Sequence, residues 1–253
     1  MIDLKTLREI GNAKGLRNVG QMEKDYFQEI LLLFISRSSG SNLIFKDGTC
    51  LYKLYSLDRF SEDLDFDGYL GERFNSMLVH FLKNYGYSSR IKVENFLGGN
   101  ESLKVLIAGQ LYTGKNESMC RIVLDFSNRE TPILQPSFVN FYPLYHDIPP
   151  FPIWSMNPSE ILAEKIRALM YRKKARDLYD VYFLIKKGVK TTTGLLNKKL
   201  SIYGIEFSEN LFQEGIETAK ANWDSELSVF VNNLQAVGPI SQLVAESLKK
   251  MQY

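Results

Sequence analysis

The chain is poor in the residues that build disulfide frameworks and zinc sites. Among 253 residues it has only two cysteines, Cys50 and Cys120, and two histidines, His80 and His146. Neither pair has the spacing of a metal-binding motif, and two cysteines make no disulfide framework. A disulfide-stapled fold and a structural zinc site are therefore excluded as the basis of this protein.

A long hydrophobic run is also missing. The longest, Ile30–Ile35, is far shorter than the roughly 20 residues that cross a bilayer. The N-terminal sequence MIDLKTLREIG lacks the apolar region of a signal peptide, and the formal net charge is only +2. We therefore expect a cytoplasmic protein with no membrane partner, long enough for one large domain or two modest ones.

Hydrophobic periodicity predicts a mixed first part. Helical spacing predicts a helix over 21–37, which leads to a short buried strand over 42–46. A tight turn at Asp47–Thr49 and a short helix over 50–57 follow. Alternating sequence predicts a strand over 63–67. An apolar run predicts a further strand over 121–126.

Prolines then become frequent over 132–158, where the hydrophobic residues show no helical period. Such a stretch is typical of a long connector or a hairpin-rich edge. Helix signals dominate afterwards, and they predict helices over 158–171, 176–187, 207–220 and 223–237. The order predicts an α+β fold of two domains, an α/β core with an N-terminal helix over 1–150 and a helical domain over 151–253 that contributes to a cleft.

The stretch DRFSEDLDFDGY, residues 58–69, places three carboxylates two residues apart. In a strand Asp63, Asp65 and Asp67 share one face. Like charges repel, and burying them uncompensated is costly. A pair of Mg²⁺ ions would offset this charge, because Mg²⁺ prefers carboxylates, waters and substrate phosphates. An edge strand with one solvated polar face is the alternative.

Two neighbouring features fit the same metal site. Gly48 lets the backbone approach a ligand, Thr49 offers a hydroxyl, and N–H groups at a helix start favour a phosphate; a plain turn is the alternative. Asp125 interrupts the apolar run CRIVLDFSN. If this strand pairs beside 63–67, Asp125 completes a three-acid cage for two metals. Otherwise it is an acid at a strand end near water.

Each charged feature of the predicted helical domain also has both a functional and an ordinary structural explanation. Lys165 lies off the apolar stripe of its predicted helix, as does Glu164, so it is either surface charge or a phosphate ligand in a cleft. The basic turn 172–176 is either a solvated loop or a patch for a nucleic-acid backbone or a triphosphate. Asp177 and Asp180 share one helical face, and one interpretation gives them a catalytic or base-positioning role.

These two aspartates also have ordinary explanations. Asp177 is suited to the start of a helix, where an acid favours the dipole. Asp180 is four residues from Arg176 and can pair with it. Arg59 and Lys46 are expected to offset the acids or to reach a phosphate.

Two segments together resemble the AbiEii/AbiGii toxin family of the DNA polymerase β superfamily. They are FKDGTCLYKLYSLDRFSEDLDFDGY and NPSEILAEKIRALMYRKKARDLYDVYFL, with Asp125 between them. The family typically reads K-G-G-T-x-L and then R-x-S-x-D-[LI]-D. The sequence departs from this pattern at Asp47, which replaces the first glycine and places an extra acid beside the expected phosphate site.

The resemblance implies a polymerase β-like nucleotidyltransferase domain with a small mixed sheet, plus a helical C-terminal domain. It implies roles for three groups of residues: metal ligands Asp63 and Asp65, triphosphate contacts Gly48 and Thr49, and second-lobe residues Lys165, Asp177 and Asp180. It also implies a toxin of a toxin–antitoxin or phage-defence system, with NTP as substrate, tRNA as a possible acceptor, and an antitoxin that acts without a stable complex.

Together these observations predict Mg²⁺-dependent transfer of NMP from an NTP to an RNA or protein hydroxyl. The predicted catalytic residues are Asp63, Asp65, Asp125, Lys165, Asp177 and Asp180, with Asp125 as third ligand of two Mg²⁺ ions. The predicted nucleotide-binding residues are Lys46, Gly48, Thr49 and Lys165. Two alternatives are a GTP- or NTP-binding regulatory module without turnover, and an interaction protein whose acidic strand binds a basic partner.

Overall fold

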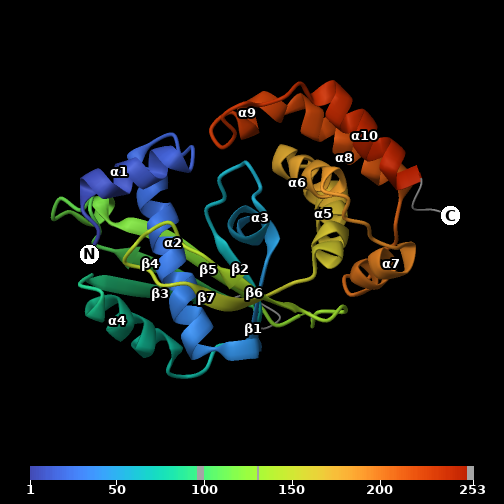
Figure 1. The fold of residues 1–253 in the computed structure, drawn as a ribbon. Coiled ribbons are helices and arrows are strands. Elements are labelled where there is room, and N and C mark those ends of the chain that lie inside the picture. The colour runs from blue at the N-terminus through green and yellow to red at the C-terminus, as the bar shows by residue number, and fades with distance from the viewer. Residues whose placement is uncertain (96–99, 130, 250–253) are drawn as a thin grey trace. The chain divides into compact units, whose positions relative to one another are not determined.

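Figure 1 shows the protein as a computed structural model that describes residues 1–95, 100–129 and 131–249. The chain divides into two compact units. Unit 1 comprises Met1–Ser56, Phe60–Thr131 and Pro136–Ser155, and unit 2 comprises Leu57–Arg59, Pro132–Gln135 and Met156–Tyr253. The predicted division at residue 150 into a catalytic core and a helical domain that shares a cleft stays a prediction.

Unit 1 is built on a seven-stranded mixed sheet with the strand order β3-β4-β5-β2-β1-β7-β6. The strands are β1 (Leu43–Lys46), β2 (Leu64–Gly68), β3 (Ser89–Asn95), β4 (Glu101–Ile107), β5 (Cys120–Ser127), β6 (Ser137–Phe141) and β7 (Phe151–Ser155). The pairs β2/β5 and β1/β7 are parallel, and the other neighbours are antiparallel. The proline-punctuated stretch forms the β6/β7 hairpin, which confirms the hairpin-edge interpretation.

Four helices of unit 1 accompany the sheet: α1 (Leu4–Ala13), α2 (Val19–Ser38), α3 (Asp47–Tyr55) and α4 (Phe74–Asn84). The core of the sheet is a row of rings across β1, β2 and β5, where Phe66 stacks between Phe45 and Phe126. Phe34 of α2 and Phe126 of β5 both contact the ring of Phe74. The apolar face of these central strands therefore packs toward α2 and α4.

The helix α3 begins earlier than predicted. The expected turn at Asp47–Thr49 is its first turn, so that β1 passes into α3 with no loop between them. Asp47 makes the change of direction with a φ of 62°, a left-handed conformation that glycine adopts most readily. Ser56 has the same φ of 62° and caps the other end of α3.

Unit 2 is mainly helical over its described residues from Pro158 onward. Its helices are α5 (Pro158–Arg172), α6 (Ala175–Lys186), α7 (Thr193–Ser201), α8 (Glu209–Ala221), α9 (Trp223–Leu227) and α10 (Val237–Lys249). Asn157 caps α5 by accepting the Ser159 N–H at 3.0 Å, with proline in the first turn as predicted. The helix predicted over 223–237 is wrong beyond Leu227, because the Trp223 indole donates to the Gln235 carbonyl and the chain folds back.

The helices and the mixed sheet confirm the predicted α+β class. Within the described residues, no helix combines the length and the apolar character needed to cross a membrane.

Candidate active site

The predicted carboxylate strand forms, and it lies beside the strand that carries Asp125. β2 and β5 pair in parallel in a register that places Asp65 next to Asp125, about 5 Å apart at the Cα atoms. The residues that flank the two aspartates are fully buried or nearly so: Leu64, Phe66, Leu124 and Phe126. Because side chains alternate along a strand, both half-buried aspartates point to the opposite face of the sheet. The condition set for Asp125, that its strand pairs beside residues 63–67, is therefore met.

Lys46 extends this row onto a third strand. β1 and β2 are antiparallel, and their register places Lys46 opposite Asp65. The Lys46 ammonium lies 2.6 Å from Asp67 Oδ1, and the Asp67 side chain is 1% exposed. The row therefore reads cation, carboxylate, carboxylate across β1, β2 and β5. Lys46 offsets acidic charge as predicted, and its contact with a nucleotide stays a prediction.

Thr49 ties the start of α3 to Asp63. Its side chain is buried, and its hydroxyl donates to the backbone carbonyl of Asp63. Asp63 precedes β2 by one residue and is exposed. The structure thus gathers six of the predicted residues in unit 1: Lys46, Gly48, Thr49, Asp63, Asp65 and Asp125.

The two predicted phosphate donors at the start of α3 have partners within the chain. We expected the Thr49 hydroxyl to face a phosphate, but it donates to Asp63. The Gly48 N–H donates to Asp47 Oδ1 at 2.7 Å. A phosphate oxygen that reaches this N–H would have to replace the Asp47 carboxylate. The nucleotide contacts of Gly48 and Thr49 stay predictions.

The donor set suits Mg²⁺. Asp65 and Asp125 offer carboxylate oxygens side by side, and Asp63 comes two residues before Asp65. Across the described parts of the chain, no three His, Cys, Asp or Glu side chains stand close enough to form a ready-made metal cage. Mg²⁺ is usually held by one or two carboxylates together with waters and substrate phosphates. These residues therefore fit a Mg²⁺ ion whose remaining ligands are waters or, when a nucleotide is bound, phosphate oxygens.

The three predicted residues of unit 2 also meet, in a buried ion-pair cluster around Asp180. Each oxygen of the Asp180 carboxylate accepts one hydrogen bond of 2.6 Å from the Arg59 guanidinium, and Lys165 Nζ lies 2.8 Å from Asp180 Oδ2. Burial alone would raise the pKa of Asp180, but the charges of Arg59 and Lys165 outweigh it and hold that pKa below 3.8. The predicted role of Arg59 in offsetting acids is confirmed.

Asp177 completes this cluster. It is fully buried in the first turn of α6, 3.8 Å from Lys165 Nζ and 2.9 Å from Arg172 Nη2. The alternative partner of Asp180, Arg176, is exposed, and Asp180 pairs with Arg59 instead. Lys165 is only 3% exposed, so the expectation that it lies off the buried face is wrong. Catalytic roles for these three residues stay predictions.

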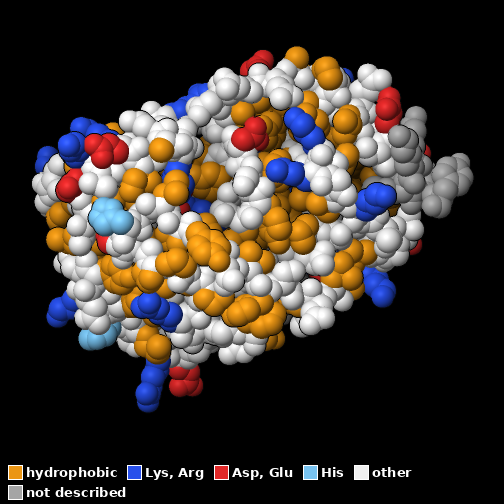
Figure 2. Space-filling model, in the orientation of Figure 1, with side chains coloured by type: hydrophobic (Ala, Val, Ile, Leu, Met, Phe, Trp, Pro, Cys, Tyr) orange, Lys and Arg blue, Asp and Glu red, His pale blue; other side chains and the backbone are white. Residues whose placement is uncertain are grey.

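The basic turn between α5 and α6 is largely paired with acids. Lys173 lies 2.5 Å from Glu214, and Lys174 lies 3.5 Å from Glu226. On the face that Figure 2 shows, basic side chains are interspersed with acidic and apolar ones. This distribution supports no broad basic surface on that face.

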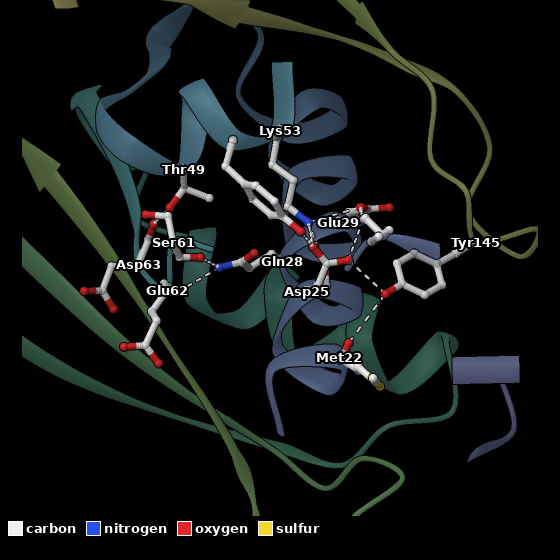
Figure 3. A network of polar contacts seen from close by, with 12 residues as sticks. Met22, Asp25, Gln28, Glu29, Thr49, Lys53, Ser61, Glu62, Asp63 and Tyr145 are labelled. Carbon is white, nitrogen blue, oxygen red and sulfur yellow. Dashed lines mark hydrogen bonds and ion pairs between the residues drawn. The ribbon is translucent and has the colours of Figure 1, made fainter. Parts of the chain in front are cut away.

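The sequence interpretation missed a buried charge network on α2. Lys14 and Lys53 bridge Asp25 and Glu29, whose side chains are fully buried. The hydroxyls of Tyr52 and Tyr145 donate to Asp25 at 2.7 and 2.8 Å, as Figure 3 shows in part. We call these six residues the α2 charge network. Because Lys53 and Tyr52 belong to α3, the network fixes α3 against α2.

Comparison with known proteins adds the remaining observations. A family model described as "Nucleotidyl transferase AbiEii toxin, Type IV TA system" matches residues 31–242. MenT4, a nucleotidyltransferase toxin from Mycobacterium tuberculosis H37Rv, is similar in structure, with a TM-score of 0.67 at 18% identity over 100% of this chain and 90% of that one. JHP933 from Helicobacter pylori has a TM-score of 0.59 at 19% identity, over 94% and 96% of the two chains. No curated protein matches by sequence. The structural likeness confirms the predicted nucleotidyltransferase fold.

Proposed function

The chain belongs to the AbiEii family of nucleotidyl transferase toxins of type IV toxin–antitoxin systems, and we propose that it transfers a nucleoside monophosphate from an NTP to an RNA hydroxyl with the help of Mg²⁺. Membership makes it a nucleotidyltransferase, which sets aside the alternatives of a regulatory module without turnover and of a plain interaction protein. The observation that best supports the proposed site is the row of Lys46, Asp65 and Asp125 across three adjacent strands. An expected acceptor is the 3′ end of a tRNA, and a protein hydroxyl is the other outcome of the test.

In this proposal Asp63, Asp65 and Asp125 hold the metal. Two bound Mg²⁺ ions would lower the pKa of the acceptor hydroxyl and neutralise charge on the α-phosphate and the leaving pyrophosphate. Asp125 accepts the proton of the acceptor hydroxyl. It suits this role because it is half-buried and is held beside Asp65 by the strand pairing.

The start of α3 binds the triphosphate. Its first N–H groups and the positive end of its dipole favour a phosphate oxygen, which takes the place of Asp47 on the Gly48 N–H. Lys46 lies at the end of β1, directly before this turn. It can exchange its contact with Asp67 for a phosphate oxygen, because both are anionic partners.

In this proposal Lys165 takes part in the same reaction. Asp177 and Asp180 hold its ammonium in place, and we assign to it the neutralisation of charge on the departing pyrophosphate. The setting is the cytoplasm, where NTPs and tRNA are present together. An antitoxin that restrains the toxin without a stable complex completes the proposed system.

The proposal is tested by incubating the pure protein with each labelled NTP, Mg²⁺ and either total RNA or a protein mixture. Labelled RNA is expected, and its size on a gel identifies the acceptor class. A variant with Asp63→Ala and Asp65→Ala is expected to lose transfer. A matched variant with Glu94→Ala and Glu101→Ala removes two carboxylates from β3 and β4 of the same sheet and retains transfer.

Wild-type rates in the aspartate double variant would refute the site. Labelled protein with no labelled RNA would refute the acceptor and leave the site intact. Transfer that is unaffected by removal of divalent cations would refute the metal dependence.

A further inference from the structure

Of the three proposed metal ligands, Asp63 alone lies outside the strand ladders. β1 pairs with residues Asp65–Gly68 of β2, and β5 pairs with residues Leu64–Asp67 of β2. Residues 60–63 form neither helix nor strand. The sheet therefore fixes the positions of Asp65 and Asp125, while the position of Asp63 depends on other contacts.

Those contacts come from side chains of α2 and α3. The Gln28 amide donates to two successive backbone carbonyls, those of Ser61 and Glu62, at 2.8 Å each. The Thr49 hydroxyl donates to the next carbonyl, that of Asp63. Figure 3 shows the amide of Gln28 beside these carbonyls, with the Asp63 carboxylate directed away from the α2 charge network. Three consecutive carbonyls before β2 are thus held by side-chain donors.

The burial and the hydrogen bonds of the Gln28 side chain indicate more than a packing role. Gln28 is fully buried, and among the described residues its Oε1 has no hydrogen-bond partner. A buried acceptor without a partner is unfavourable, and an apolar residue of the same shape would avoid this cost. What the amide provides is the pair of donors on Ser61 and Glu62. Lys24, one turn earlier on α2, adds an ion pair of 2.5 Å to Glu62.

We propose that Gln28 is a positioning residue for the Asp63 carboxylate. It does not touch metal or nucleotide. It holds the backbone of residues 61–62 so that the carboxylate of Asp63 stays on the same side as that of Asp65. The inference rests on the proposed function, because it takes these aspartates as metal ligands. Partners that orient metal ligands typically contribute 10–100-fold to metal affinity.

The test measures Mn²⁺ binding in the absence of nucleotide, by the loss of the electron paramagnetic resonance signal of free Mn²⁺. Gln28→Met keeps an unbranched side chain of similar size and removes both donors. Its Kd for Mn²⁺ is expected to rise about tenfold. Gln110→Met is the matched control, because Gln110 also uses its amide twice, on the Ile2 carbonyl at 3.0 Å and the Tyr87 hydroxyl at 2.7 Å. It is expected to leave the Kd unchanged.

A double-mutant cycle separates positioning from a general loss of stability. If Gln28 acts through Asp63, Gln28→Met has no further effect on Mn²⁺ affinity in the Asp63→Asn background. In the metal-free protein, amide hydrogen exchange at residues 61–64 is expected to be faster in Gln28→Met than in the wild type. Gln28→Asn keeps the amide but shortens its reach by one methylene, and a rise in Kd in the same direction is expected. It replaces Gln28→Met if that variant does not fold.

Two results would overturn the inference: a wild-type Kd in both Gln28 variants, or an undiminished tenfold effect in the Asp63→Asn background. Failure of the proposed function has a different signature. In that case Asp65→Asn combined with Asp125→Asn would leave Mn²⁺ binding unchanged.

Discussion

Replacing Lys53 by methionine is expected to destabilise unit 1 strongly. The Lys53 ammonium lies 2.6 Å from Asp25 Oδ1 and 3.1 Å from Glu29 Oε1, and all three side chains are at most 1% exposed. Removing one partner from a buried ion pair costs about 3–5 kcal/mol, because the remaining charge stays buried. Lys14 still contacts both carboxylates, which favours the lower end, about 3 kcal/mol. That corresponds to a fall in Tm of about 6–12 °C.

The destabilisation by Lys53→Met is expected to depend on pH, in a direction set by the pKa of Asp25. Burial alone would raise the pKa of Asp25, but the charges of Lys53 and Lys14 outweigh it and hold that pKa below 3.8. Without Lys53 the pKa of Asp25 rises, so its carboxylate takes up a proton more easily and the buried charge disappears. The destabilisation by Lys53→Met is therefore smaller at pH 5 than at pH 7.

The assay is urea unfolding followed by circular dichroism at both pH values. Adding Glu29→Gln to Lys53→Met removes the excess negative charge and is expected to recover part of the loss. Lys5→Met is the exposed control, because the Lys5 side chain is 85% exposed, and it is expected to change stability by about 0.5 kcal/mol or less. A loss below about 1 kcal/mol for Lys53→Met, or an equal loss at both pH values, would refute the reasoning.

Two further predictions concern the start of α3 and the response to acid. Asp47→Gly relieves a left-handed residue with a φ of 62° and is expected to add about 1 kcal/mol to the free energy of unfolding. Because it also frees the Gly48 N–H, the KM for NTP should fall. Ser56→Gly, at the same φ, should change stability alone, and an unchanged KM in Asp47→Gly would contradict this. The pKa values of Asp25 and Asp180 are both held below their ordinary value of 3.8. Their contribution to stability is therefore complete above about pH 5 and is lost as the pH falls further. Circular dichroism against pH checks this, and constant stability down to pH 2 would contradict it.

The carboxylate face was predictable because it depends on local alternation. Leu64 and Phe66 are apolar and the aspartates between them are not, so a strand with one acidic face follows from the period of two. The pairing of Asp65 with Asp125 was predicted only conditionally, since a partner strand some sixty residues along the chain is not encoded in local pattern. The structure supplies that pairing.

The burial of charged residues was the feature of the fold that the local sequence pattern did not predict. Glu160 and Glu164 look like solvent-facing residues of an amphipathic helix, yet both are buried and pair with Lys199 at 3.0 and 2.7 Å. Asp25 and Gln28 have the same appearance on α2. Each has at least one partner that is distant in sequence, and that partner is known only once the chain is folded.

The start of α3 was misplaced for a related reason. Asp47 follows a strand and precedes glycine, which is typical of a turn. The helix nevertheless begins at Asp47, because this residue adopts a positive φ and lets β1 pass directly into α3.

The measurement that tests the central claim most directly is the location of a bound metal. Crystals grown with Mn²⁺ and a non-hydrolysable analogue of the preferred NTP would show the ion by anomalous scattering. We predict Mn²⁺ coordinated by Asp65 and Asp125, with a phosphate oxygen of the analogue in the same coordination shell. A nucleotide-bound Mn²⁺ held elsewhere, with both aspartates uncoordinated, would contradict it.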